Sequence, residues 1–149
     1  MTNKLVRLRN KTKLKSIKKI ITFLIKLFGM DIPENVTIGE NVTFLHGGLG
    51  VVITGNTVIE DDVIIMQNVT LGAKSLLPNY PKHITIKKGA IISAGSVILC
   101  EPGGELIIGE ESIIGANAVL LESVGPREIW AGVPARFIKY REDIVEEQD

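Results

Sequence analysis

The sequence predicts an all-β solenoid, and three observations support this fold class. A large apolar marker residue recurs every six positions in four phased blocks; the residue four positions after it is small or β-branched; and glycine follows it in several repeats. Such a unit describes a short strand and a turn, stacked so that each layer buries the face of its neighbour. The markers are Ile32, Ile38 and Phe44; Ile53, Ile59, Ile65 and Leu71; Ile86, Ile92 and Ile98; and Ile108, Ile114 and Leu120.

An ordinary amphipathic sheet does not account for this pattern, because alternation with a period of two gives no fixed six-residue phase. Loops are expected where the phase shifts, and loops on a rigid scaffold commonly carry functional side chains. The three interruptions lie between Phe44 and Ile53, between Leu71 and Ile86, and between Ile98 and Ile108.

Charge divides the 149-residue chain. Residues 1–26 hold nine of the 17 Lys and Arg residues and no acid, whereas the remainder holds all 17 acids. We expect a basic amphipathic helical segment over 1–29, a solenoid domain over 30–140 and an acidic C-terminal tail over 141–149. The acidic solenoid argues against nucleic-acid binding. The single cysteine and the lack of a visible signal peptide favour the cytoplasm.

The basic segment predicts a short N-terminal α-helix, because apolar residues from Leu14 to Phe28 fall at helical spacing with lysines largely elsewhere. Such a helix can cap the exposed end of a solenoid. It can also lie on an anionic membrane surface through residues 12–28, which would give a membrane-peripheral location. The two roles can coexist.

Residues 30–140 contain a set of distinctive motifs. They are Asp31-Ile32, Ile38-Gly39, His46-Gly47, Gly50-Val51-Val52, Ile59-Glu60-Asp61-Asp62-Val63, Gln67-Asn68-Val69-Thr70-Leu71-Gly72, Ile114-Gly115-Ala116 and Ala131-Gly132-Val133-Pro134-Ala135-Arg136. These motifs resemble the hexapeptide-repeat acyltransferases and, within them, the catalytic region of serine O-acetyltransferases. The resemblance implies a left-handed parallel β-helix, a homotrimer with active sites between subunits, and direct transfer of an acyl group from acetyl-CoA to a hydroxyl.

His46 is the predicted general base. An alcohol is a poor nucleophile near neutral pH, and an imidazole can accept its proton as the new C–O bond forms. His46 stands in a glycine-rich loop, where small neighbours leave room for two substrates. Asp31 lies fifteen residues earlier, at the separation of the family's Asp-His pair, so the resemblance implies that its carboxylate orients the imidazole.

The resemblance also implies a slot for coenzyme A, lined by backbone groups at Gly72, Ala73, Ala94 and Ala116, with Arg136 and Lys139 near the phosphates. No metal is expected, because the chain has only two histidines and one cysteine. The same shortage excludes a γ-class carbonic anhydrase, which needs three zinc-binding histidines. We interpret His83 as a solvated loop or edge residue and Cys100 as structural.

Three residues depart from the serine acetyltransferase pattern. Leu45 replaces an acid that helps to bind the serine amino group, and Asn79-Tyr80 replace the Arg-His that addresses its carboxylate. We therefore predict an O-acetyltransferase for a sugar or polysaccharide-precursor hydroxyl. Two alternatives remain open: a serine O-acetyltransferase of cysteine biosynthesis, and a non-catalytic hexapeptide scaffold that binds a partner.

Overall fold

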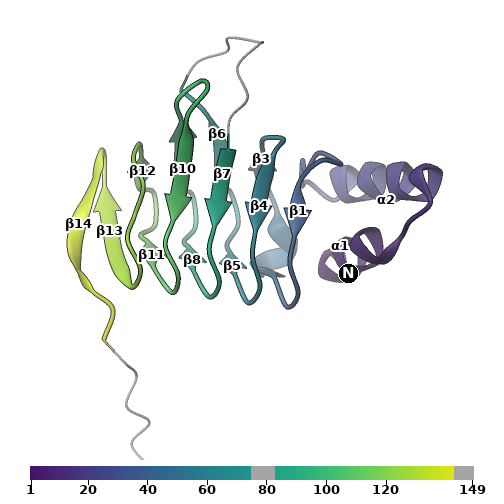
Figure 1. The fold of residues 1–149 in the computed structure, drawn as a ribbon. Coiled ribbons are helices and arrows are strands. Elements are labelled where there is room, and N and C mark those ends of the chain that lie inside the picture. Colours follow the sequence, from purple (N-terminus) through teal and green to yellow (C-terminus); the bar gives the residue numbers. More distant parts are fainter. Residues whose placement is uncertain (75–82, 143–149) are drawn as a thin grey trace, which may run out of the picture.

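The computed structural model describes residues 1–74 and 83–142, and its strands wind into a parallel β-helix (Figure 1). Each coil gives one strand to each of three sheets, so that a strand pairs with the strand three places later in the chain. The predicted solenoid is therefore confirmed. The first sheet contains β1 (Thr37–Ile38), β4 (Thr57–Ile59), β7 (His83–Ile86) and β10 (Glu105–Ile108).

The other two sheets complete the coils. The second sheet contains β2 (Thr43–Phe44), β5 (Ile64–Ile65), β8 (Ile91–Ile92) and β11 (Ile113–Ile114), followed by β13 (Glu128–Gly132) and β14 (Ala135–Tyr140). The third sheet contains β3 (Val52–Ile53), β6 (Thr70–Ala73), β9 (Val97–Cys100) and β12 (Val119–Leu120). The one antiparallel pairing among the described strands is the closing hairpin of β13 and β14.

The six-residue phase forms the core. Marker residues of successive coils pair directly, as Phe44 does with Ile65 and Ile65 with Ile92, so they form columns inside the solenoid. Every marker is buried except Ile38, which is half-buried and packs against the core from the first coil.

The small residues four positions after the markers are buried as well, including the polar ones. The hydroxyls of Thr57, Ser96 and Ser112 each donate to the carbonyl oxygen three residues earlier, at 2.8, 2.8 and 2.7 Å. A buried hydroxyl is tolerated only when it is hydrogen bonded. These bonds close the corner turns, which explains how serine and threonine share a position with valine and alanine.

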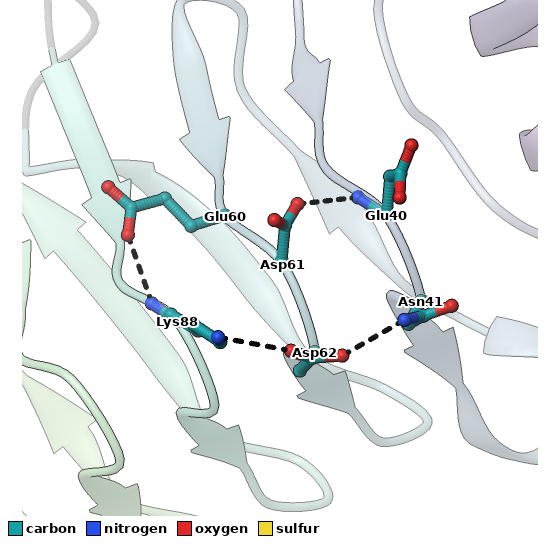
Figure 2. A network of polar contacts seen from close by, with 6 residues as sticks. All are labelled: Glu40, Asn41, Glu60, Asp61, Asp62 and Lys88. Carbon is teal, nitrogen blue, oxygen red and sulfur yellow. Dashed lines mark hydrogen bonds and ion pairs between the residues drawn. The ribbon is translucent and has the colours of Figure 1, made fainter.

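Carboxylates join neighbouring coils at the corner between the first and second sheets (Figure 2). Asp61 Oδ1 accepts from the backbone N–H of Glu40 at 2.7 Å, and Asp62 Oδ1 accepts from Asn41 Nδ2 at 3.2 Å. On the other side, Glu60 Oε2 accepts from the backbone N–H of Lys88 at 3.1 Å. The acidic run at residues 60–62 therefore binds one coil to the next.

The N-terminal segment folds as two helices where the sequence predicted one: α1 (Thr2–Lys11) and α2 (Lys15–Leu27). Both lie beyond β1 at one end of the solenoid (Figure 1). Neither of these described helices has the length and apolar content needed to cross a membrane.

Helix α1 caps the first coil. Arg9 is fully buried, and its Nη1 and Nη2 donate to the carbonyl oxygens of Ile32 and Val36 at 3.3 and 3.0 Å. Asn3 pairs with both the N–H and the carbonyl of Phe44, at 3.0 and 3.1 Å, as an edge strand would. Burial lowers the pKa of Arg9, against an opposing effect of Glu34. Helix α1 thus caps the first coil, whereas the helix that the sequence predicted from Leu14 to Phe28 is α2.

Of the predicted C-terminal tail, residues 143–149 lie outside the described residues, as do residues 75–82 of the second interruption. Asn79-Tyr80, which replace the family's Arg-His, therefore lie outside the described residues too.

Candidate active site

His46 lies at the corner that joins the second sheet to the third. It follows β2, within the 3₁₀ turn η1 (Leu45–Gly48), and its side chain is exposed. Its backbone is left-handed, with φ 51° and ψ 33°, as it is at seven other non-glycine residues in the described part of the chain.

The glycines after His46 are required by the turn. Gly48 and Gly50 both have positive φ, and a Cβ at either would overlap a neighbouring side chain, Met30 or Asn68. The backbone N–H of Gly50 donates to the Gly29 carbonyl at 2.8 Å, which fixes the turn against the end of α2. The glycine-rich loop therefore holds His46 in a defined backbone position.

The same corner recurs in each coil and brings His46 into line with two predicted cofactor-binding residues. Backbone N–H groups link the corners, Gly95 to the Gln67 carbonyl at 3.0 Å and Asn117 to the Ala94 carbonyl at 2.9 Å. Phe44, Ile65, Ile92 and Ile114 pair in the second sheet. The residues two positions after them in the sequence are His46, Gln67, Ala94 and Ala116. We call this set the corner column.

Gln67 is a member of the corner column that the sequence reasoning did not propose. Its Oε1 is buried and has no hydrogen-bond partner among the described residues. An unpaired buried polar atom costs about 1–3 kcal/mol, so Gln67 Oε1 needs a donor, from water or from another molecule. One sequence feature could have identified Gln67: it is a long polar residue at the repeat position where the next two coils have alanine.

Asp31 does not contact His46 in the described part of the chain. Its carboxylate accepts a hydrogen bond from Lys26 Nζ at 2.9 Å, and both side chains are about half exposed. Exposed ion pairs of this kind contribute little and exchange readily. The role of Asp31 as the group that orients His46 stays a prediction.

Gly72 and Ala73 end β6, where they pair with Leu99 and Cys100 of β9. Gly72 differs from the turn glycines: a Cβ there would make ordinary contact with Leu99 Cδ2 at 3.5 Å, and its φ is not positive. Packing within residues 1–74 and 83–142 therefore does not require glycine at position 72.

Arg136 and Lys139 lie on β14 with exposed side chains. Arg136 Nη1 pairs with Glu122 at 3.2 Å, and Lys139 Nζ pairs with Glu142 at 3.0 Å. Both cations remain accessible, and their predicted role near phosphates stays a prediction.

The other residues with reactive side chains lie elsewhere. His83 starts β7 and is exposed, whereas Cys100 is buried at the end of β9, where burial raises the pKa of its thiol. Within residues 1–74 and 83–142, no group of three or more His, Cys, Asp or Glu is placed to hold a metal ion.

A hollow of about 480 Å³ in the described part of the chain does not contain His46. It lies between α1 and the first coil, with Arg7 and Lys11 on one side and Glu40 and Asp61 on the other. His46 therefore lies on the surface of the described chain, away from this hollow.

No family model matches the chain, but curated proteins and solved structures do. The serine acetyltransferase of Salmonella typhimurium is 39% identical over 111 residues, covering 74% of this chain and 38% of that protein. The serine acetyltransferase of Mycobacterium tuberculosis is 39% identical over 112 residues, covering 75% and 46%. The chain thus spans less than half the length of these curated relatives.

A solved structure of serine acetyltransferase from Brucella abortus in complex with coenzyme A superposes with a TM-score of 0.77 at 30% identity, covering 94% of this chain and 55% of that one. The fold is thus a left-handed β-helix of the hexapeptide-repeat class. Within that class, the chain is a homologue of the serine acetyltransferases, which confirms the resemblance predicted from its motifs.

Proposed function

We propose that the chain is an acetyl-CoA-dependent O-acetyltransferase whose acceptor is the hydroxyl of serine. The exposed, backbone-constrained His46 in line with Ala94 and Ala116 is the observation that supports this proposal. The homologues favour serine over the sugar hydroxyl that the sequence reasoning preferred.

In the proposed reaction, the His46 imidazole removes the proton of the acceptor hydroxyl as its oxygen attacks the thioester carbonyl. The new C–O bond forms, the C–S bond breaks, and the leaving thiolate takes the proton from the imidazolium. No acyl-enzyme is required. Asp31 would stabilise the imidazolium after releasing Lys26, a small cost for an exposed pair.

The small residues support the proposed coenzyme A slot. Ala94 and Ala116 occupy the same corner position in adjacent coils, and Gly72 is a glycine that its own chain does not require. A slot lined by backbone needs small side chains along its wall. Arg136 and Lys139, both exposed, would face the phosphates and exchange their present carboxylate partners for phosphate oxygens.

A homotrimer belongs to this proposal, because His46 and Ala116, at the two ends of the corner column, are exposed and a neighbouring subunit would supply the facing wall. Sedimentation equilibrium should then give three times the 16.2 kDa chain mass. A monomer with full activity would contradict the shared-site arrangement.

Leu45 favours a second candidate acceptor, an uncharged alcohol such as a sugar hydroxyl. It is half-buried next to His46 and offers no charge to a serine ammonium group. The acceptor therefore depends on which neighbours of His46 contact the substrate.

A panel of acceptors tests both candidates. The purified chain is incubated with acetyl-CoA and with serine or a set of neutral sugars, and release of the coenzyme A thiol is followed. Serine turnover supports the proposal, and turnover of neutral alcohols alone supports the second candidate. If no acceptor is turned over and acetyl-CoA does not bind, the non-catalytic scaffold is the better account.

Leu45→Asp sharpens the test. A carboxylate beside His46 should lower the KM for serine by at least about fivefold through a charge-assisted contact with its ammonium group. Leu45→Asn is the matched control, because it has the same shape without the charge and should leave the KM unchanged. Equal effects of the two variants would show that residue 45 does not contact the amino group.

A further inference from the structure

We propose that α2 docks this protein on an anionic membrane surface. Only Ile21 and Ile25 of this helix are buried in the fold. The rest of its large apolar side chains are exposed and form what we call the α2 apolar face, continued by one residue at each end: Leu14, Ile17, Ile20, Phe23, Leu24, Leu27 and Phe28.

The α2 apolar face is a continuous stripe. At the helical repeat of 3.6 residues, Ile17, Ile20 and Leu24 follow one another along one side, with Phe23 and Leu27 beside them. Ile20, Phe23 and Leu27 are 60%, 62% and 66% exposed. Exposed apolar patches of this extent mark interaction sites.

Capping does not explain the α2 apolar face, because α1 performs the capping. The bonds from Asn3 and Arg9 to the first coil all come from α1. Figure 1 shows α1 and α2 side by side at the N-terminal end of the solenoid, and α2 buries only the two isoleucines. The remaining apolar surface has no partner among the described residues.

Lysines border the α2 apolar face. Lys15, Lys19 and Lys26 fall together on the flank next to Phe23, and Lys15, Lys18 and Lys19 have no ion-pair partner in the described part of the chain. Long lysine side chains can reach lipid headgroups while the apolar residues beside them enter the acyl boundary.

Charge favours an anionic surface over a second copy of the chain. Residues 1–26 carry nine bases and no acid, so two α2 faces brought together would repel each other. Anionic headgroups would neutralise the same charges. The remainder of the chain carries 17 acids against eight bases, so a membrane that attracts the helices would repel the solenoid. The helical end is therefore the part that would make the contact.

Vesicle flotation tests the proposal with the full chain. We expect binding to vesicles of phosphatidylcholine mixed with phosphatidylglycerol to be at least about tenfold tighter than to phosphatidylcholine alone, and to weaken at high salt. Equal binding to both vesicles, or to neither, would overturn the anionic surface as the partner.

Two matched variants locate the contact. Ile20→Asp should weaken vesicle binding by roughly tenfold or more, because it places a charge in the middle of the α2 apolar face. Ile138→Asp is the control, since Ile138 on β14 is 59% exposed against 60% for Ile20 and receives the same new charge.

Both variants should keep the circular dichroism of the wild type, because the substituted side chains lie on the surface. Equal loss of binding in the two variants would overturn the assignment to α2. So would dissociation of the proposed trimer, or of any larger assembly, by Ile20→Asp, since the face would then bind a second copy. Neither readout depends on acetyl transfer, so this proposal can fail while the proposed function stands.

Discussion

Replacing His46 with asparagine removes the proposed base while preserving the backbone that holds it. His46 is left-handed with φ 51°, a conformation that alanine adopts at a cost of roughly 1–2 kcal/mol and asparagine tolerates. This fold itself uses asparagine or aspartate at most of its other left-handed, non-glycine positions: Asn41, Asn56, Asp62, Asn68 and Asn117. His46→Asn is therefore a cleaner test of chemistry than His46→Ala.

The expected loss in rate is large and the expected loss in stability is small. A positioned general base contributes about 10²- to 10⁴-fold, so acetyl transfer should fall at least about a hundredfold. That fall corresponds to about 2.7 kcal/mol of transition-state stabilisation. Because the His46 side chain is exposed, the free energy of unfolding should change by less than about 0.5 kcal/mol.

The assay follows the coenzyme A thiol with a chromogenic disulfide at saturating acetyl-CoA and acceptor. Cys100, the sole cysteine, is buried and should add little background. His83→Asn is the matched control, because it makes the same substitution in the other histidine, which is also exposed, and should retain the wild-type rate. A His46→Asn variant that is folded and keeps more than a tenth of the wild-type rate would refute general-base catalysis by this residue.

Three further predictions concern the solenoid. Ile92→Ala should lower the free energy of unfolding in urea by about 2–5 kcal/mol, because Ile92 is fully buried. Ile91→Ala, on the outer face, should lower it by less than half as much. Equal losses would contradict the inward orientation of Ile92. The hydrogen bond from Lys87 lowers the pKa of Glu60, against opposing desolvation, so wild type should exceed Glu60→Gln in Tm at neutral pH. The difference in Tm should be lost as the pH falls below about 4.3, the pKa of Glu in the unfolded chain, and through the lowered pKa of folded Glu60. A difference in Tm that grows on acidification would show that folding raises the pKa of Glu60. Because burial raises the pKa of the Cys100 thiol, iodoacetamide should react slowly until urea unfolds the chain, and fast reaction in the native state would place the thiol at the surface.

The fold could be predicted because the six-residue phase is a direct record of which side chains face inward. Ile65 and Ile92 stand 27 residues apart with an interruption between them, yet they pair in the second sheet. Apolar burial fixes this register, since a shift of one residue would turn every marker outward. Handedness came only from the resemblance, because the same inward pattern fits a coil of either hand.

The cap on the first coil could not be predicted from the pattern. Arg9 is the kind of residue that sequence reasoning leaves in solvent, yet its guanidinium is buried against the Ile32 and Val36 carbonyls. Those carbonyls have no strand of a preceding coil to bond to, because the solenoid begins there. The sequence pattern alone does not show this. Burial of a charged group is tolerated when such acceptors meet it.

For the candidate site, the motif identified His46 but not its surroundings. Asp31 forms an exposed ion pair with Lys26 because α2 ends next to it. The spacing between Asp31 and His46 in the sequence gives no information about this pair. Gln67 begins one of the motifs that carry the family resemblance. Only the register of β2 with β5 shows that it lies one coil from His46. Residue spacing along the chain thus located the base, while the neighbours came from strand pairing.

The corner column ties the proposed chemistry to the core. Adjacent strands lie about 4.8 Å apart, so the corners that carry His46 and Ala116, three coils apart, are separated by about 14 Å along the solenoid. The buried markers beneath these corners, from Phe44 to Ile114, set that spacing. A cavity under the Ala94 corner would therefore disturb the proposed slot without touching His46. Such a change should raise the KM for acetyl-CoA more than it lowers kcat, because the base keeps its own turn while the wall of the slot moves.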